Sequence, residues 1–394
     1  MGLLRGQNIK IYNVDPTDNT IQQLIMPGQV ERLVHDTRLP GGFWLMKFQM
    51  PMTDAAYWDW RINRQFVRAR LQLGSTTLLS EGRLQRYEGP INAPTLVFGG
   101  YYNNFRDSVN DDKTYSKSYN TTAKLIIQDM LTNGFHADTL QVNNTNFDNI
   151  DDMGVTINQT YNKESNLWDV LTNPTNGVLN TGDTADRIVD FGVWDDRIVY
   201  LKARNPSVVT WKAYRSAVPG GVRGTFAPRV NLMGLHNAVT TLYNVTSNAG
   251  GVDEIVVETE TAVSSDAASI SAGLRREFVV RNIGESVSGP AVSRSAVALA
   301  SAKSAQQEVD AIVITKVFDI NGIAQPLCKV RSGDVLQISD LVPTSSGLGS
   351  VALDGFRTFF ISQTSCVHER GELIIRPDRE SKSLDARLGR NQIL

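Results

Sequence analysis

The feature that most constrains the fold of this chain is the order of short segments in its second half, where strand patterns and helix patterns alternate. The strand patterns are a strand pair around an acidic turn, a polar-to-apolar strand, a strand run and a last hairpin: Ile188–Leu201, Leu235–Val245, Pro326–Leu341 and Phe356–Pro377. The helical patterns are Asp266–Arg276 and the Ala/Ser-rich segment Pro290–Val309. Strand-rich units that are interrupted by helical segments predict a sheet-based fold with helical insertions.

The first hundred residues show the same strand character. In Phe43–Met50 and in Phe66–Leu73, apolar side chains alternate with other side chains along the segment. Short strands spaced about 8–12 residues apart favour a barrel or a sandwich.

Residues 103–180 differ in composition, because 15 of these 78 residues are Asn. Asn forms turns with its own backbone, so this region is predicted to be rich in loops. Apolar periodicity predicts two helices, at Thr121–Asn133 and Ser165–Thr172, and either Asn120 or Thr121 can cap the first. The whole chain is therefore predicted to be mainly β with α insertions, an α+β fold.

Composition excludes some classes of partner. Among the 394 residues, 39 Lys and Arg nearly cancel 41 Asp and Glu, which leaves a net charge of −2. A chain without a large positive field is not expected to recognise nucleic acid specifically. There is no apolar run of about 18 residues, so no membrane span is expected.

The residues that could carry chemistry are scattered. The four histidines lie far apart in the sequence, without the spacing of metal ligands: His35, His136, His236 and His368. We predict that His236 and His368 occupy ordinary polar positions. The Asp pairs at 111–112, 151–152 and 195–196 lie in turn-like or Asn-rich settings, where Asp has a structural role. No nucleophile elbow and no phosphate loop is present. We therefore predict no catalytic, cofactor-binding or metal-binding residues, no cofactor and no enzyme activity.

Cys328 and Cys366 are too few for a disulfide framework. Both fall in predicted strands and could be neighbours in space. The simplest interpretation is two buried thiols that behave as small apolar residues.

Two clusters could serve either packing or contact. Four arginines concentrate positive charge in one stretch: Arg61, Arg64, Arg68 and Arg70. They are expected to form a solvated strand face, a charged contact with a neighbouring subunit or, as the remaining alternative, a contact with nucleic acid. Three aromatic residues precede them, Tyr57, Trp58 and Trp60, and these pack in the core, anchor an interface or stack on sugars.

The order of segments resembles the tail hub, or baseplate hub, proteins of tailed bacteriophages. The resemblance is strongest over residues 186–388. It extends to residues 66–135, where RARLQLG, EGRLQRYEGPI, GYYNN and TAKLIIQDML look like the family's first barrel running into its helical segment. In that family, two related β-barrels are joined by helical subdomains, and three copies form a ring of quasi-sixfold symmetry.

The resemblance implies a division of the chain and a role. The first barrel would be residues 1–102, followed by an Asn-rich loop and helix subdomain, 103–185. The second barrel would combine 186–265 with 310–377, with a helical insertion at 266–309 and a C-terminal arm at 378–394. The implied role is a trimeric ring between the sixfold tail tube and a threefold spike or fibre, around the genome channel.

The implied partners are two further copies of the chain, the tail tube or distal-tail protein, and the central spike, fibre or tape-measure protein. The implied location is the virion, at the tail tip or baseplate, after assembly in the cytoplasm of the bacterial host. Two alternatives remain open: a hexameric distal-tail or adaptor ring, and a tail-tip protein that binds or degrades carbohydrate.

Overall fold

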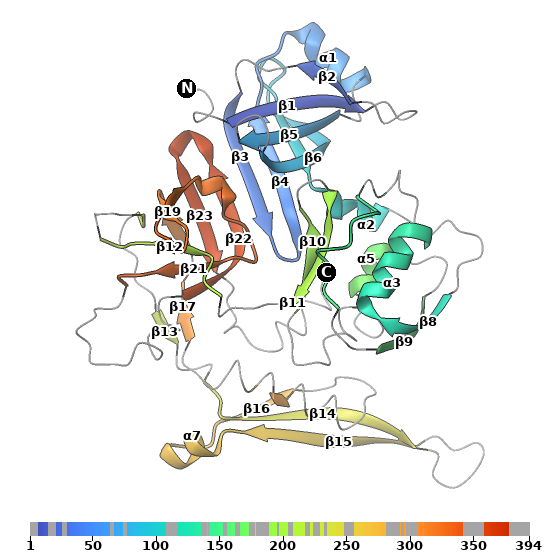
Figure 1. Cartoon of the computed structure of the whole chain (residues 1–394), viewed down its shortest axis with the longest axis vertical. Coiled ribbons are helices and arrows are strands. Elements are labelled where there is room, and N and C mark those ends of the chain that lie inside the picture. Colours follow the sequence, from blue (N-terminus) through green and yellow to red (C-terminus); the bar gives the residue numbers. More distant parts are fainter. Residues whose placement is uncertain are drawn as a thin grey trace.

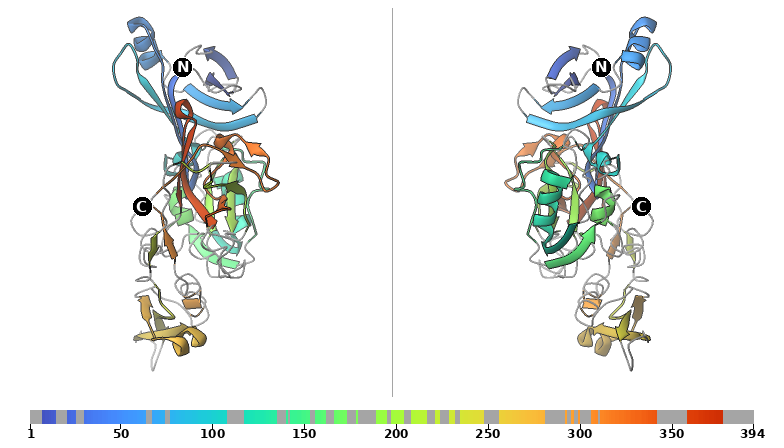
Figure 2. Two further views of the ribbon diagram at one scale, coloured as in Figure 1. Left: turned by 90° about the vertical axis from the view of Figure 1, so that its left-hand side faces the viewer. Right: turned by 90° about the vertical axis from the view of Figure 1, so that its right-hand side faces the viewer.

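The computed structural model describes residues 7–14, 21–25, 30–63, 67–73, 77–107, 117–134, 140, 142–152, 156–161, 166–172, 178, 189–194, 197–203, 208–216, 221–223, 229–231, 235–247, 256–280, 292, 295–296, 299, 306–309, 311–341 and 358–377. The described chain is mostly β, as predicted. It is elongated, with three levels along its longest axis (Figure 1, Figure 2). The C-terminal segment 378–394, predicted to be an arm, lies outside the described residues.

The upper level is built from the first seven strands. These are β1 (Gln7–Val14), β2 (Ile21–Ile25), β3 (Glu31–Arg38), β4 (Gly41–Gln49), β5 (Val67–Leu73), β6 (Thr77–Glu88) and β7 (Thr95–Gly99). They lie side by side in the order β2-β1-β5-β6-β7-β4-β3, and each neighbouring pair is antiparallel. One helix, α1 (Asp54–Asn63), lies between β4 and β5 in the sequence.

The same sheet continues into strands from the far end of the chain, to a total of 16 described strands. The added strands are β10 (Val189–Val193), β11 (Val199–Ala203), β12 (Trp211–Ala213), β18 (Ile312–Ile314), β19 (Val317–Phe318), β20 (Ala324–Gln325), β21 (Val335–Ile338), β22 (Thr358–Val367) and β23 (Glu372–Pro377). The link is an antiparallel ladder between β3 and β22, in which Thr37 pairs with Thr364 and His35 with Cys366. The predicted hairpins at Ile188–Leu201 and Phe356–Pro377 are both present, as β10–β11 and β22–β23.

One hydrophobic core runs through both parts of this sheet. It contains Met46, Phe48 and Phe98 of the first strands together with Ile361 and Ile375 of the last ones, all fully buried. Side chains on alternate strand positions point to one face, so the alternation in the sequence becomes a continuous apolar layer.

A second core lies under the helical part of the chain. Its elements are η1 (Tyr101–Asn103), α2 (Asn104–Asp107), β8 (Lys117–Thr122), α3 (Ala123–Asp129), the π-helical turn η2 (Met130–Gly134), β9 (Thr156–Tyr161) and α5 (Leu167–Thr172). Ile126, Ile127 and Trp168 of this part pack with Phe191 and Leu201 of β10 and β11.

The helix predicted at Thr121–Asn133 begins later than expected. Residues 117–122 form β8, which pairs with β9, so the N-cap moves to Thr122. Thr122 is extended and makes no side-chain capping bond. The prediction of Asn120 or Thr121 as the cap was therefore wrong, because both residues belong to β8 and pair with β9.

The lowest level is a separate sheet that projects from the body (Figure 1, Figure 2). It consists of β14 (Ala238–Ser247), β15 (Val256–Ser265) and β16 (Glu277–Val280), with α7 (Ala267–Ala272) after β15. A further pair, β13 (Arg229–Asn231) with β17 (Gln306–Glu308), stands between this sheet and the body in Figure 1.

The pairing within this sheet is local. Strands β14 and β15 pair with each other and β14 also pairs with β16, so in the described residues none of the three pairs with the strands that were grouped with β14 and β15 in a second barrel. The region 266–309 is helical at 267–272 and at the described positions 292, 295, 296 and 299, but it also supplies β16 and β17. A local hairpin costs less loop entropy than a distant pairing, which accounts for the independent sheet. In the described part of the chain, no helix has the length and apolarity that a bilayer span requires.

Candidate functional site

A row of buried polar side chains follows the β3–β22 ladder. Burial alternates along both strands and places His35 and Thr37 of β3 on one face with Thr364 and Cys366 of β22. The hydroxyl oxygens of Thr37 and Thr364 lie 2.6 Å apart, and the backbone N–H of Ser332 donates to Thr37 Oγ1 at 2.9 Å. We call Thr37, Thr364, His35, Cys366 and His368 the polar seam, because they join the first strands of the chain to the last.

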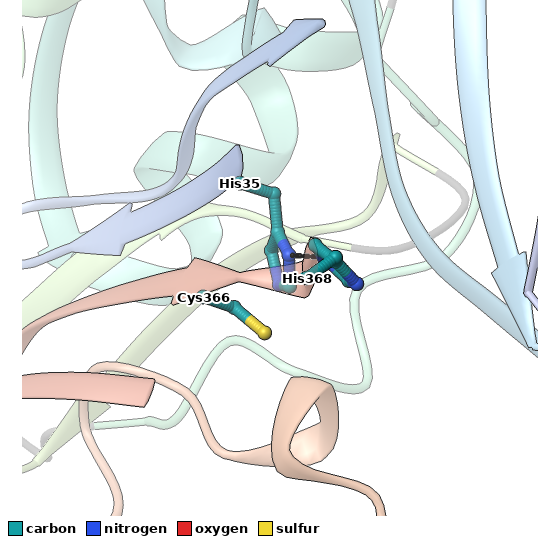
Figure 3. A group of neighbouring side chains, drawn as sticks. All are labelled: His35, Cys366 and His368. Carbon is teal, nitrogen blue, oxygen red and sulfur yellow. Dashed lines mark hydrogen bonds between the residues drawn. The ribbon is translucent and has the colours of Figure 1, made fainter. Parts of the chain in front are cut away.

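The polar seam brings two distant histidines into contact (Figure 3). His35 Nδ1 lies 2.8 Å from His368 Nε2, although the residues are 333 apart in the sequence. His368 opens the short 3-10 helix η7 (His368–Arg370) that follows β22, and both rings are 2% exposed. The prediction of an ordinary polar position for His368 was wrong, because the nonlocal β3–β22 pairing buries it against His35.

Burial sets the protonation of both rings. Desolvation, helped by His368 and Arg331, holds the pKa of His35 well below its usual value. Desolvation lowers the pKa of His368 to about 4. Both rings are therefore neutral near pH 7, with one N–H of the pair directed at the ring nitrogen of the other.

The two cysteines lie in the same core, and Cys366 is also part of the polar seam. Cys328 lies in the 3-10 helix η5 (Leu327–Lys329), not in a strand as predicted, and Cys366 lies in β22. Both are buried in the first core and neither is disulfide-bonded, which agrees with the expected buried thiols. Desolvation, with contributions from Cys328 and Asp36, raises the pKa of Cys366. One ring nitrogen of His35, one of His368 and the sulfur of Cys366 all lie within 4.8 Å of one another.

The predicted arginine face is solvated only in part, because Arg61 is exposed whereas Arg68 is buried. Arg68 is only 7% exposed, and its guanidinium lies 5.6 Å from the Tyr101 ring centroid. Glu81 on the neighbouring strand β6 is 4% exposed and forms an ion pair with Arg70. Its carboxylate also accepts a 2.7 Å hydrogen bond from the Tyr101 hydroxyl.

This cluster reaches the strands from the second half of the chain. Arg197, in the turn of the β10–β11 hairpin, has its Nε 4.0 Å from Glu81. Desolvation, opposed mainly by Tyr101, lowers the pKa of Arg68. The buried carboxylate of Glu81 therefore interacts with several guanidinium groups. Through these interactions the arginines help to join the first strands to the β10–β11 hairpin. Arg64 lies outside the described residues.

The aromatic run on α1 is divided between core and surface. Tyr57 and Trp60 are 7% and 2% exposed, in agreement with core packing. Trp58 and Ile62, by contrast, are 49% and 66% exposed. Part of α1 therefore presents apolar surface outward.

The other candidate residues do not converge. His236, beside β14, has its ring centroid 5.4 Å from that of Phe278, and desolvation lowers its pKa. Asp151 and Asp152 are exposed. His136 and the Asp pairs at 111–112 and 195–196 lie outside the described residues.

Two strands meet through glycine contacts. β10 runs parallel to the start of β4, with Gly192 paired to Gly41 and Val193 to Gly42. A Cβ at Gly192 would lie 2.4 Å from the carbonyl carbon of Gly41, and one at Gly42 would lie 2.5 Å from the Val193 oxygen. No side chain larger than hydrogen fits at this crossing, so glycine is required there.

No protein-family model and no curated protein sequence matches this chain. Several solved structures, however, are similar to it. The 43 kDa tail protein of prophage MuSo2 from Shewanella oneidensis is similar over 95% of this chain and 99% of that one, with a TM-score of 0.53 and 12% identity. A tail protein from Neisseria meningitidis MC58 is similar over 95% of this chain and 97% of that one, with a TM-score of 0.51 and 11% identity.

A third similar structure is the prophage tail protein gp18 from Listeria monocytogenes EGD-e. It covers 96% of both chains, with a TM-score of 0.50 and 10% identity. These likenesses extend over nearly the full length of each pair of chains. The chain therefore has the fold of phage and prophage tail proteins, as the resemblance in its sequence implied.

Proposed function

We propose that this chain is a structural virion protein, a tail or baseplate hub. It forms a trimeric ring that connects the sixfold tail tube to a threefold central spike or fibre. The observation that carries the proposal is the end-to-end similarity to three tail proteins. A shared inserted domain would match only part of each chain, whereas these matches extend over at least 95% of both partners.

The sheet pairing supports a two-unit hub. Strands β1 to β7 form one uninterrupted block of the sheet, and β3 at its edge pairs with β22 to continue into the late strands. We assign a first barrel to residues 1–102, with 103–185 beside it, and a second to the strands of 186–216 and 310–377. Three copies would then supply six barrels, which matches a sixfold tube.

The projecting sheet supports a contact role for the middle of the chain. Val263, Leu274 and Val279 are 51%, 81% and 38% exposed on or beside β15 and β16. Exposed apolar side chains on a projecting element are typical of surfaces that partners cover. We assign this sheet, residues 238–280, and the exposed side of α1 to contacts within the ring or with the tube and spike.

The mechanism of such a hub is geometric and needs no catalytic group. Each ring subunit buries its exposed apolar surface and sheet edges against neighbours, and the surface that a completed ring exposes selects the next component. The partners would be two further copies, the tube or distal-tail protein and the spike, fibre or tape-measure protein. The tail tip of the virion is the corresponding location.

Two alternatives predict different results. A distal-tail or adaptor protein would form a hexamer. A tail-tip protein that binds or degrades carbohydrate would act on host glycan. Neither has a specific observation in its favour among the described residues.

The experiment is quantitative mass spectrometry of purified tail particles, combined with antibody labelling viewed by electron microscopy. The proposal predicts half as many copies of this chain as of a protein that forms a single hexameric ring in each tail, and label at one end of the tail. Equal copies would support the adaptor. Absence from the particle, or turnover of host glycan by the purified chain, would refute the hub.

A further inference from the structure

The polar seam places three metal-binding side chains over one ladder. His35 and Cys366 are cross-strand partners in the β3–β22 register. His368 follows two positions after Cys366, which returns its side chain to the same face. Figure 3 shows His35 reaching toward His368, with Cys366 beside the pair.

The spacing of the donor atoms is close to that of a metal centre. The three atoms lie within 4.8 Å of one another, and His35 Nδ1 and His368 Nε2 are 2.8 Å apart. Two imidazole nitrogens on one tetrahedral zinc ion stand about 3.3 Å apart, given Zn–N bonds of about 2.0–2.1 Å. The rings need to separate by about half an ångström to admit the ion, a movement within side-chain reach.

The chemistry of the three side chains indicates which kind of ion they would bind. Two imidazoles and a thiolate are borderline-to-soft ligands that suit zinc, whereas calcium and magnesium prefer oxygen. We propose that His35, Cys366 and His368 bind a zinc ion. Three protein ligands leave one tetrahedral position for a non-protein ligand.

Burial places the proposed ion inside the core. His35 and His368 are each 2% exposed and Cys366 is 3% exposed. Neutral imidazoles offer the lone pairs that a metal needs, and zinc deprotonates a thiol that it coordinates. The positive charge of Arg331 disfavours a cation at His35, whereas the Asp36 carboxylate interacts with Cys366. The thiolate neutralises one charge of the ion.

The position of the site defines its consequence. His35 lies in the first forty residues, and the other two ligands lie in the last thirty. A bound zinc ion would therefore clamp the seam between the early and late strands, and metal affinity would add directly to the stability of the fold. This inference does not depend on the proposed tail role.

The test uses the full chain, purified without a metal-affinity tag. Zinc is measured by mass spectrometry of the protein as isolated, after chelator dialysis and after zinc is restored. Cobalt is then titrated into the zinc-free protein. The expected results are equimolar zinc, a rise in thermal midpoint on restoring it, and a thiolate-to-cobalt charge-transfer band.

Variants assign the ligands. Cys366→Ser should remove the charge-transfer band, and His368→Gln should weaken zinc binding by roughly tenfold or more, the scale at which even outer-shell partners act. Cys328→Ser is the matched control, because Cys328 is buried in the same core but lies outside the three-atom group. It should keep both the zinc and the band.

Circular dichroism and gel filtration establish that each variant is folded. If His368→Gln does not fold, Cys366→Ser alone still tests the thiolate. A wild-type chain that retains no zinc and develops no cobalt band would overturn the proposal, leaving a histidine hydrogen bond beside a buried thiol. Equal loss of the band in Cys328→Ser would overturn the assignment of ligands.

Discussion

Glu81 is the residue at which the electrostatics of the fold can be tested most sharply. Its buried carboxylate accepts a hydrogen bond from Tyr101 and pairs with Arg70, and Arg197 approaches to 4.0 Å. Glu81→Gln keeps the size of the side chain and removes its charge. The buried Arg68 nearby then loses the negative charge that offsets its own.

The expected cost lies between two limits. Removing one partner of a fully buried pair costs about 3–5 kcal/mol, whereas an exposed pair contributes about 0–1 kcal/mol. The side chains of Arg70 and Arg197 are 23% and 32% exposed, so water compensates part of the loss. We expect Glu81→Gln to lower the free energy of unfolding by about 2–3 kcal/mol.

The matched control is on the same strand. Glu88 pairs with Arg86, but these side chains are 46% and 66% exposed, so Glu88→Gln should change stability by no more than about 0.5 kcal/mol. Denaturant unfolding measures both variants, and hydrogen exchange of the β5–β6 amides locates the effect. Equal stabilities for the two variants would refute the claim that Glu81 neutralises the arginine cluster.

Three further outcomes follow from contacts elsewhere. Gly192→Ala should destabilise the chain by about 1–3 kcal/mol in denaturant unfolding, because its Cβ would strike backbone, while Gly273→Ala, whose Cβ would have 3.7 Å to its nearest neighbour, should not. Trp60→Ala should cost about 3–5 kcal/mol of stability, whereas Trp58→Ala should stay within about 1 kcal/mol and instead reduce incorporation into particles, measured by immunoblot. Burial raises the pKa of Asp340, but hydrogen bonds from the segment after β12 outweigh it and leave the pKa below its usual value. The stability from Asp340 is therefore present above about pH 4 and lost as pH falls through the lower folded pKa, so Asp340→Asn should unfold with less acid sensitivity than wild type.

Local patterns in the sequence predicted those strands, hairpins and helices that depend mainly on neighbouring residues. Alternation in Phe43–Met50 and the turn residues between Ile188 and Leu201 identified β4 and the β10–β11 hairpin. Helical periodicity located α3 and α5 to within a few residues. These elements depend on near neighbours, so their signals lie within short windows.

Pairings between distant segments left no such signal. The contact of His35 with His368 exists only because β3 pairs with β22, and no spacing rule joins residues 333 apart. Arg68 alternates as a solvated residue would, yet it is buried, with Tyr101 and Glu81 close to its guanidinium. The Asn-rich region concealed β8 for a similar reason, because its partner β9 begins more than thirty residues later.

The central claim is the place of this chain in a particle, and the most direct measurement is a cryo-electron microscopy map of the tail tip. The account predicts three copies in one ring, between a sixfold tube and a threefold spike, with the projecting β14–β15–β16 sheet in contact with a neighbouring chain. Six equivalent copies, or a particle in which this chain has no density at the tail end, would contradict it.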